Sequence, residues 1–294
     1  MTIADRMNNP GQKKLLALDG GGIRGALTIE ILADIEAKLR AQRIAEGRMQ
    51  ASDRFALADY FDYIAGTSTG AIIASCLSWG MSADEIRDFY KKNGETMFDS
   101  ASITQRLTAN KYSDQKLAEK LRELFSQDDG SPATLGTAKL HTLLMMVMRN
   151  ASTDSPWWVC NNPAAKYNRP ERRDAPKHDC NLDIPLWQLI RASTAAPVFF
   201  PPEKVLFGAR DFEFVDGGIT PHNNPAFQLF IMATSEPYQL SWPTGEDKML
   251  IVSIGTGASA DTDMSFFTKF LGQHYVYPAT HIPNHLMLAA LTEH

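Results

Sequence analysis

The pentapeptide at 66–70, G-T-S-T-G, has a serine at its centre and is the first segment whose residue types could do chemistry. Its G-x-S-x-G pattern holds a nucleophilic serine when it joins a strand to a helix. Gly66 and Gly70 have a mechanical role there, because a side chain at either position would collide with the neighbouring strand or helix. We therefore interpret Ser68 as a candidate nucleophile, with a helix N-terminus behind it to favour developing negative charge. The alternative is a buried serine in a tight turn.

A carboxylate that could accept the serine proton is found at Asp216, which precedes Gly217 and Gly218. A short apolar strand is expected at 213–215, so the carboxylate belongs at the edge of the sheet where Ser68 is expected. Partial loss of hydration would keep the pKa of this carboxyl group high enough for it to act as a base. The alternative is an aspartate that only caps a glycine turn.

The segment at 19–25, D-G-G-G-I-R-G, is rich in glycine and follows an apolar run that predicts a strand. Consecutive backbone N–H groups in such a loop form a cup that can bind an oxyanion. The arginine would hold this loop or bind a phosphate-bearing substrate. The candidate oxyanion hole therefore comprises Gly20, Gly21, Gly22, Arg24 and Gly25.

The same segment also satisfies G-x-G-x-x-G, so a dinucleotide site is a second interpretation. Such a site needs an acidic residue about 20 positions further on, at the end of a second strand. Glu36 is expected inside a helix and Glu46 in a charged stretch, so neither fits. A dinucleotide site would also leave Ser68 unexplained, and the oxyanion interpretation is therefore favoured.

Two consecutive strand-turn-helix units must position the serine and the glycine loop. Apolar residues predict strands at 15–18 and 61–65, each followed by glycines and then by a helix, at 26–40 and 71–79. Consecutive units of this kind imply a parallel sheet. Further along, the pattern predicts a helical insertion at 82–125 with an N-cap at Ser82, strands at 140–149, 157–160 and 249–254, a helix at 185–196, and a surface excursion at 161–183.

The composition excludes several classes of protein. A formal charge of -5 with both signs interspersed gives no basic face, so a nucleic-acid polymer is not expected as a partner. Nowhere do about 18 apolar residues follow one another, the length that a membrane-spanning helix needs. The N-terminus lacks the apolar stretch of a secretory signal, and the three cysteines form no C-x-x-C pair. We therefore expect a cytoplasmic protein whose contact with membranes is peripheral.

In this order, the three glycine-marked segments resemble the signature of the patatin-like phospholipases. Segments at 192–197 and 254–257 are also similar to family segments, so the resemblance extends over about residues 13–257. The family's third motif often reads D-G-A, and Gly218 replaces the alanine here. The resemblance implies an α/β fold, a patatin-like three-layer α/β/α sandwich with a mainly parallel central sheet. It also implies one catalytic domain over 13–257, followed at 258–294 by a C-terminal helical extension that reads like a helix cut short.

The resemblance further implies an activity. It makes Ser68 the nucleophile, Asp216 its only acid/base partner, and the glycine loop the oxyanion hole of a lipid acyl hydrolase of the phospholipase A type. The substrates would be fatty acyl esters of membrane phospholipids, met at the bilayer surface on the inner face of the membrane. Neither a metal nor an organic cofactor is implied.

Two other functions compete with this one. An α/β-hydrolase with a Ser-Asp-His triad would place its histidine after the aspartate. The candidates for that histidine are His222, His274, His281 and His285. A non-catalytic nucleotide-binding module could keep the glycine loop without catalysing a reaction. The presence of both Ser68 and Asp216 is evidence against this alternative.

Regulation and assembly are further hypotheses. Some bacterial patatin-like enzymes serve as effectors of cyclic-nucleotide antiphage defence, and the N-terminus here, which leads directly into the glycine loop, is similar to theirs. A cyclic-nucleotide activator is therefore one hypothesis, and packing of the 258–294 tail on another chain, as in a homo-oligomer, is another. Trp157, Trp158 and the pair Phe199-Phe200 are either core residues or an interfacial patch that draws lipid from a bilayer.

Overall fold

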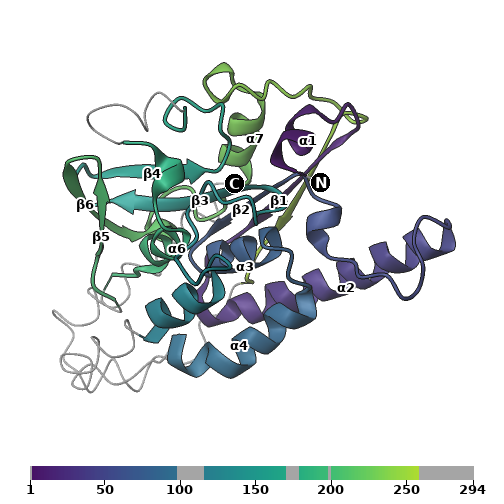
Figure 1. Cartoon of the computed structure of the whole chain (residues 1–294), viewed down its shortest axis with the longest axis horizontal. Helices are drawn as coiled ribbons and strands as arrows, with labels where there is room; N and C mark the ends of the chain where they lie inside the picture. The colour runs from purple at the N-terminus through teal and green to yellow at the C-terminus, as the bar shows by residue number, and fades with distance from the viewer. Residues whose placement is uncertain (1, 98–115, 170–178, 198–199, 258–294) are drawn as a thin grey trace.

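A central sheet of seven strands organises the part of the chain that the computed structural model describes, residues 2–97, 116–169, 179–197 and 200–257 (Figure 1). Its order is β5-β6-β3-β2-β1-β7, and β4 pairs with β3 outside this path. β1, β2, β3 and β7 pair in parallel, whereas β4, β5 and β6 are antiparallel to their neighbours, so the mainly parallel sheet is confirmed. The strands are β1 (Lys13–Leu18), β2 (Tyr63–Thr67), β3 (Leu143–Asn150), β4 (Ser155–Cys160), β5 (Glu203–Phe207), β6 (Arg210–Asp216) and β7 (Met249–Ile254).

Helices cover both faces of the sheet, which confirms the three-layer α/β/α sandwich (Figure 1). α1 and α7 lie over one face, and α2, α3, α4 and α6 lie over the other. The described helices are α1 (Ile3–Asn8), α2 (Gly25–Ala45), α3 (Thr69–Ser78), α4 (Ala83–Met97), a helix at 116–124, α6 (Leu186–Thr194) and α7 (Ala226–Thr234). Short 3-10 turns lie at η1 (Gly22–Arg24), η2 (Leu57–Asp59), η4 (Asn181–Asp183), η5 (Gly217–Ile219) and η6 (Glu236–Tyr238).

Residues 15–18 of β1 are all apolar because both faces of the sheet are buried. Leu16 and Leu18 pack into the larger core beneath α2 and α3, whereas Leu15 and Ala17 pack into the core beneath α7. Successive side chains of a strand point to opposite faces, and both faces of this sheet are covered. No helix in the described ranges is long and apolar enough to cross a membrane.

The segment at 161–183, predicted as a surface excursion, differs from that prediction at both of its described ends. Asn161, Asn168 and Asn181 are buried. Asn161 accepts a hydrogen bond from the Leu144 amide at 2.8 Å, and the Asn168 Nδ2 group donates to the Cys160 carbonyl at 2.7 Å. These asparagine side chains bond to backbone groups at the ends of β3 and β4. Polar residues can be buried where such hydrogen bonds pair them. The predictions for 258–294 and for Phe199 lie outside the described residues.

Ser82 begins α4 as predicted. Its Oγ accepts a hydrogen bond from the Glu85 amide at 3.3 Å, and the Ser82 amide donates to Glu85 Oε2 at 2.7 Å. This reciprocal pair is a capping box, which satisfies amides that the first turn of a helix leaves unpaired.

Candidate active site

The ends of β2 and β6 meet head to head along one edge of β3. Val147 pairs with Thr67 of β2, and the next residue, Met148, pairs with Asp216 of β6. β4 occupies the opposite edge of β3 along the same stretch, so β2 and β6 share the remaining edge. β2 and β6 therefore run toward each other. The sequence predicts Asp216 at the same edge of the sheet as Ser68, and the antiparallel β6 brings it there from the opposite direction.

Ser68 follows β2 on a strained turn and forms the N-cap of α3, with φ 55° and ψ −123°. A side chain at Gly66 would collide with the Gly70 carbonyl, and one at Gly70 would collide with the Leu18 carbonyl at the end of β1. These obstacles are backbone atoms, which cannot move aside as the end of a side chain can. The local sequence therefore dictates the turn, and the turn projects the serine from the sheet edge.

Ser68 and Asp216 are in direct contact. The Ser68 Oγ donates a hydrogen bond to Asp216 Oδ2 at 2.6 Å, and the other carboxylate oxygen accepts one from the Gly218 amide at 2.7 Å. Both side chains are buried. Burial raises the pKa of Asp216 to about 6, although the hydrogen bonds from Ser68 and Gly218 favour the charged form. At neutral pH the carboxylate is mostly ionised and is more basic than an exposed aspartate.

The glycine loop lies against the serine. A Cβ added to Gly20 would come within 3.3 Å of the Ser68 Cβ. Three of the predicted oxyanion-hole amides already have acceptors, because Gly20 donates to the Asn223 carbonyl at 3.2 Å, Arg24 donates to the Gly21 carbonyl at 3.2 Å, and Gly25 donates back into η1. These amides are not free to hold an oxyanion in this structure.

The N–H groups that remain in the loop belong to consecutive residues. Among the described residues no acceptor is found for the amides of Gly21, Gly22 and Ile23. Three successive amides of this kind can form a cup for negative charge. Ile23 is not among the residues predicted from the sequence, because an amide that has no acceptor can be identified only from the hydrogen bonds of the folded loop.

Residues distant in the chain fix the base of the glycine loop. The Thr256 Oγ1 group donates to the Gly20 carbonyl at 3.1 Å, and a side chain at Gly21 would collide with Thr256. Asp19 is buried beside the loop, and its Oδ1 has no hydrogen-bond partner among the described residues. Burial raises the pKa of Asp19 to about 7, so this carboxyl group is partly neutral at physiological pH.

A second serine anchors the turn that carries the first. The buried Ser193 Oγ accepts a hydrogen bond from the Ser68 amide at 3.0 Å and donates one to the Val147 carbonyl at 2.6 Å. Ser193 lies near the end of α6, whose neighbour Ala195 accepts from the Asp216 amide at 2.9 Å. One hydroxyl therefore links α6, β3 and the backbone of Ser68.

A sequence model described as patatin-like phospholipase matches residues 16–230. The chain belongs to this family. It is 28% identical over 269 residues to patatin group J-1 of Solanum tuberosum, covering 86% of this chain and 62% of that protein. It is 32% identical over 226 residues to a cGAMP-activated phospholipase of Vibrio cholerae, covering 74% of this chain and 56% of that protein. The chain thus spans about three fifths of the length of these relatives. A crystal structure of VipD from Legionella pneumophila aligns with 97% of this chain and 67% of its own, at 14% identity and a TM-score of 0.42.

Two interpretations compete with the patatin-like arrangement, a Ser-Asp-His triad and a dinucleotide site. The direct bond between Ser68 and Asp216 leaves no place for an imidazole between them, and the His222 ring instead packs on Trp158 with centroids 5.2 Å apart. His274, His281 and His285 lie outside the described residues.

A dinucleotide site needs an acidic residue at the end of a second strand, but Glu36 lies inside α2, as predicted. Its carboxylate accepts hydrogen bonds from the Leu57 and Ala83 amides, each at 3.2 Å. Glu36 therefore joins α2 to the η2 turn before β2 and to the first residue of α4, and it does not lie at a strand end. Its contacts are structural in this patatin-like chain.

Replacing Ser193 by alanine should impair the reaction beyond its effect on stability. The Ser68 amide and the Val147 carbonyl would each lose a buried partner, and Ser68, the candidate nucleophile, would lose its fixed position. We expect the kcat on a soluble ester to fall by about 10- to 100-fold with little change in KM. Ser78→Ala is the matched control, because it removes a buried hydroxyl at the far end of α3 that accepts from Thr142 at 2.8 Å. An equal loss of kcat in both variants would contradict the positioning role.

Proposed function

We propose that this chain is a serine lipid acyl hydrolase that cleaves fatty acyl esters of membrane phospholipids. The observation that carries the proposal is the 2.6 Å hydrogen bond between two buried groups, the Ser68 hydroxyl and the Asp216 carboxylate. A buried carboxylate in contact with a strained serine at a helix N-terminus is the arrangement of a nucleophile with its base. Membership of the patatin-like phospholipase family supports the choice of ester.

The acylation step uses this dyad directly. The Asp216 carboxylate accepts the proton of the Ser68 hydroxyl as Oγ forms a bond to the acyl carbonyl carbon. The negative charge that develops on the carbonyl oxygen is held by the amides of Gly21, Gly22 and Ile23. Asp216 then gives the proton to the departing alkoxide of the lysophospholipid, and the carbon–oxygen bond of the ester breaks.

Deacylation repeats the same steps with water. Asp216 accepts a proton from a water molecule as its oxygen attacks the acyl-enzyme carbonyl. Collapse of the second tetrahedral intermediate returns the proton to Ser68 Oγ and releases a fatty acid. The test is release of free fatty acid from a mixed phospholipid extract, measured by mass spectrometry, with the wild type compared with variants at both dyad positions.

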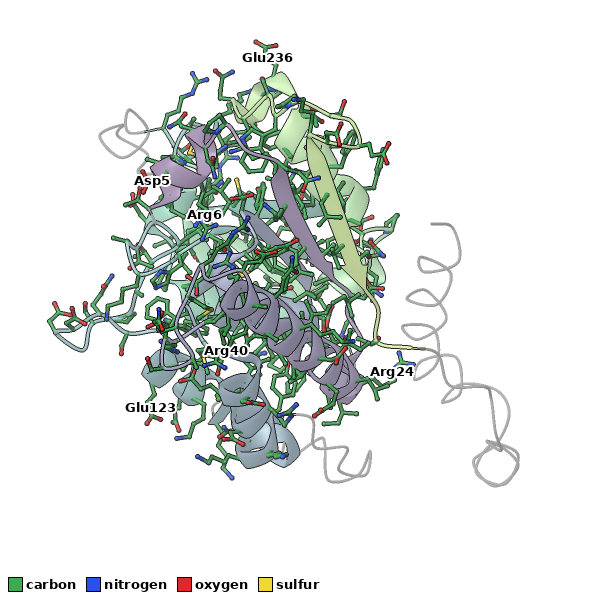
Figure 2. All side chains as sticks on the ribbon, turned by 90° about the vertical axis from the view of Figure 1, so that its right-hand side faces the viewer. Asp5, Arg6, Arg24, Arg40, Glu123 and Glu236 are labelled. Carbon is green, nitrogen blue, oxygen red and sulfur yellow. The ribbon has the colours of Figure 1, made fainter. Side chains whose placement is uncertain are left out.

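Apolar side chains beside the glycine loop support a bilayer as the place of reaction. Ile23, Leu27 and Ile31 follow one another at helical spacing along η1 and α2 and are 56%, 57% and 46% exposed. We call these three residues the α2 stripe. It begins at a proposed oxyanion-hole residue, and Arg24 lies at the same end of α2 (Figure 2). We propose that the stripe enters the acyl region of a lipid surface while Arg24 meets a headgroup phosphate.

Polar substitutions in the α2 stripe should separate lipid contact from chemistry. We expect the double variant Leu27→Ser/Ile31→Ser to bind phospholipid vesicles and to hydrolyse their lipids about tenfold less well, because two half-exposed apolar side chains no longer enter the bilayer. Hydrolysis of a soluble short-chain ester should not change. The matched control is Leu206→Ser/Phe227→Ser, at residues that are 65% and 59% exposed on other elements. If that pair reduced vesicle hydrolysis equally, or if the stripe variant lost soluble-ester activity too, the stripe would not be the lipid contact.

A second proposal concerns regulation. The relative from Vibrio cholerae is named for activation by cGAMP, and it is 32% identical over 226 residues. We propose that the activity of this chain, located in the cytoplasm and at the inner membrane face, also responds to a cyclic nucleotide. The expected result is a faster release of fatty acid when one member of a panel of cyclic oligonucleotides is added. A rate that no member of the panel changes would remove this proposal and leave the hydrolase proposal intact.

A further inference from the structure

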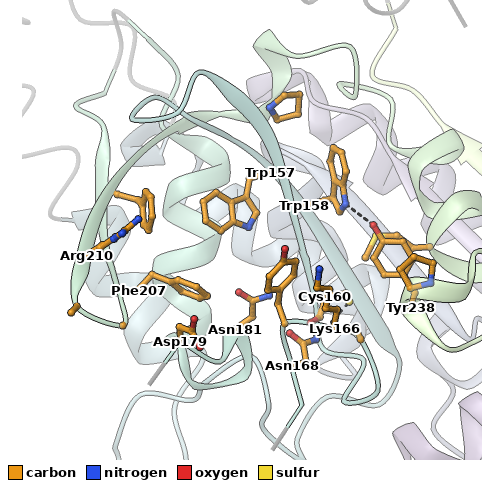
Figure 3. A pocket seen from close by; sticks show the side chains of 18 residues that line it. Trp157, Trp158, Cys160, Lys166, Asn168, Asp179, Asn181, Phe207, Arg210 and Tyr238 are labelled. Atoms are coloured by element: carbon orange, nitrogen blue, oxygen red, sulfur yellow. Dashed lines mark hydrogen bonds between the residues drawn. The ribbon is translucent and has the colours of Figure 1, made fainter. Parts of the chain in front are cut away.

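A cavity of about 560 Å³ lies beside β4 (Figure 3). It is lined by β4, by the hairpin of β5 and β6, by α7 and η6, and by the two described ends of the segment that follows β4. Neither Ser68 nor Asp216 contributes to its walls. The volume lies within the range of about 300 to 1,000 Å³ that small-molecule sites occupy.

The walls of this cavity are aromatic. Trp157 makes edge-on contacts with Phe207 and Phe212, with ring centroids 5.9 and 5.4 Å apart, and its side chain points into the cavity in Figure 3. The full aromatic set is Trp157, Trp158, Tyr167, Phe207, Phe212 and Tyr238, and no leucine, isoleucine or valine is among the described lining residues. Flat rings provide faces for stacking of a planar ligand, whereas a flexible acyl chain is more often surrounded by aliphatic side chains.

Two buried oxygen atoms at the cavity have no hydrogen-bond partner among the described residues. They are the Oδ1 atoms of Asn168 and Asn181, side chains of residues that are 2% and 6% exposed. The orientation of the Asn168 amide is fixed, because its Nδ2 group donates to the carbonyls of Cys160 and Asn162, each at 2.7 Å. Less than 1 Å² of either oxygen is accessible to solvent, so the two amides lie behind the surface of the cavity.

Positive charge is also present at the cavity. Lys166 and Arg210 both contribute to its lining and are exposed to solvent, and Figure 3 shows them on different sides of it. Asp179 is the acidic residue among the described lining residues. Two cations against one carboxylate favour a ligand that carries negative charge as well as a flat ring.

We infer that this cavity binds a nucleotide. The base stacks on the aromatic walls, and its phosphate meets Lys166 or Arg210. A linear mononucleotide and a cyclic dinucleotide share this chemistry, so the two sources are separated by experiment. The inference concerns binding alone and does not depend on hydrolysis at Ser68.

Calorimetric titration of the full chain tests the inference. The ligands are AMP, GMP, cyclic GMP–AMP, the two nucleosides, inorganic phosphate and palmitate. We expect at least one nucleotide to bind with one molecule per chain, its nucleoside to bind at least tenfold more weakly, and phosphate alone to give no heat. A preference for the mononucleotide or for the cyclic dinucleotide identifies the source. Absence of binding by every nucleotide at millimolar concentration, or tight binding of palmitate in their place, would overturn the inference.

Charge-reversal variants locate the site. Lys166→Glu and Arg210→Glu replace exposed side chains, and the one whose cation meets the phosphate should weaken nucleotide binding at least tenfold. Arg48→Glu is the matched control, because it makes the same charge change at an exposed surface pair with Glu46 and should leave affinity unchanged. Equal affinity in all three variants would place the nucleotide elsewhere and overturn the assignment. Binding that persists in Ser68→Ala would show that the cavity binds the nucleotide independently of the proposed hydrolase site.

Discussion

Replacing Ser68 by alanine, or Asp216 by asparagine, should reduce the proposed release of fatty acid from phospholipid by about 10³-fold or more. The alanine removes the atom that we propose attacks the ester. The asparagine keeps the shape of the aspartate and can still accept the Gly218 amide, but it cannot accept the proton that Oγ loses. The two residues act as one unit, so the double variant should be no slower than the slower single variant.

The controls for this result address the competing triad. His222→Gln should retain full activity, because the His222 ring packs on Trp158 and is not interposed between Ser68 and Asp216. Each variant should bind vesicles like the wild type, which excludes loss of the lipid contact as the cause. Activity that survives Asp216→Asn but disappears in His222→Gln would transfer the role of base from the carboxylate to the imidazole.

The rate on a soluble ester should rise with pH and reach a plateau above about pH 7. Burial raises the pKa of Asp216 to about 6 in the free enzyme, and only the ionised carboxylate can accept the Ser68 proton. As the pH falls through about 6, the carboxylate becomes protonated and kcat/KM decreases, to about a tenth of the plateau at one pH unit below the pKa. A plot of kcat/KM against pH between 5 and 9 measures this inflection.

Asp19 supplies the control for that profile. Burial raises its pKa to about 7, so it changes charge in an overlapping range beside the glycine loop. Asp19→Asn removes this second titration without touching the dyad, and the inflection near pH 6 should remain. A profile that is flat from pH 5 to 8, or an inflection that disappears in Asp19→Asn, would show that Asp216 is not the group whose ionisation controls the rate.

The sequence could predict what glycine dictates locally. Gly66 and Gly70 mark the turn because backbone atoms of neighbouring elements occupy the space that a side chain would need. The same patterns placed Ser68 and Asp216 among the candidate residues, and the mainly parallel three-layer fold followed from two strand-turn-helix units and from the resemblance to a family. Their roles in the reaction remain predictions.

Features that depend on contacts between distant segments could not be predicted. The direction of β6 depends on a hairpin with β5, which the sequence analysis did not identify, and this hairpin brings Asp216 to Ser68 from the opposite side. The Gly20 amide is occupied by the Asn223 carbonyl, a partner about 200 residues away along the chain. The sequence around Ser193 does not distinguish it from other helix serines, and only the packing of α6 against β3 places its hydroxyl beside the Ser68 amide.

Covalent trapping with a long-chain fluorophosphonate tests the central claim most directly, because the reagent bonds to an activated serine and stays attached. The account predicts one adduct per chain, located by peptide mass spectrometry on Ser68, which forms rapidly in the wild type and in His222→Gln but at least 100-fold more slowly in Asp216→Asn. An adduct on another residue, or equally fast labelling of Ser68 without the Asp216 carboxylate, would contradict it.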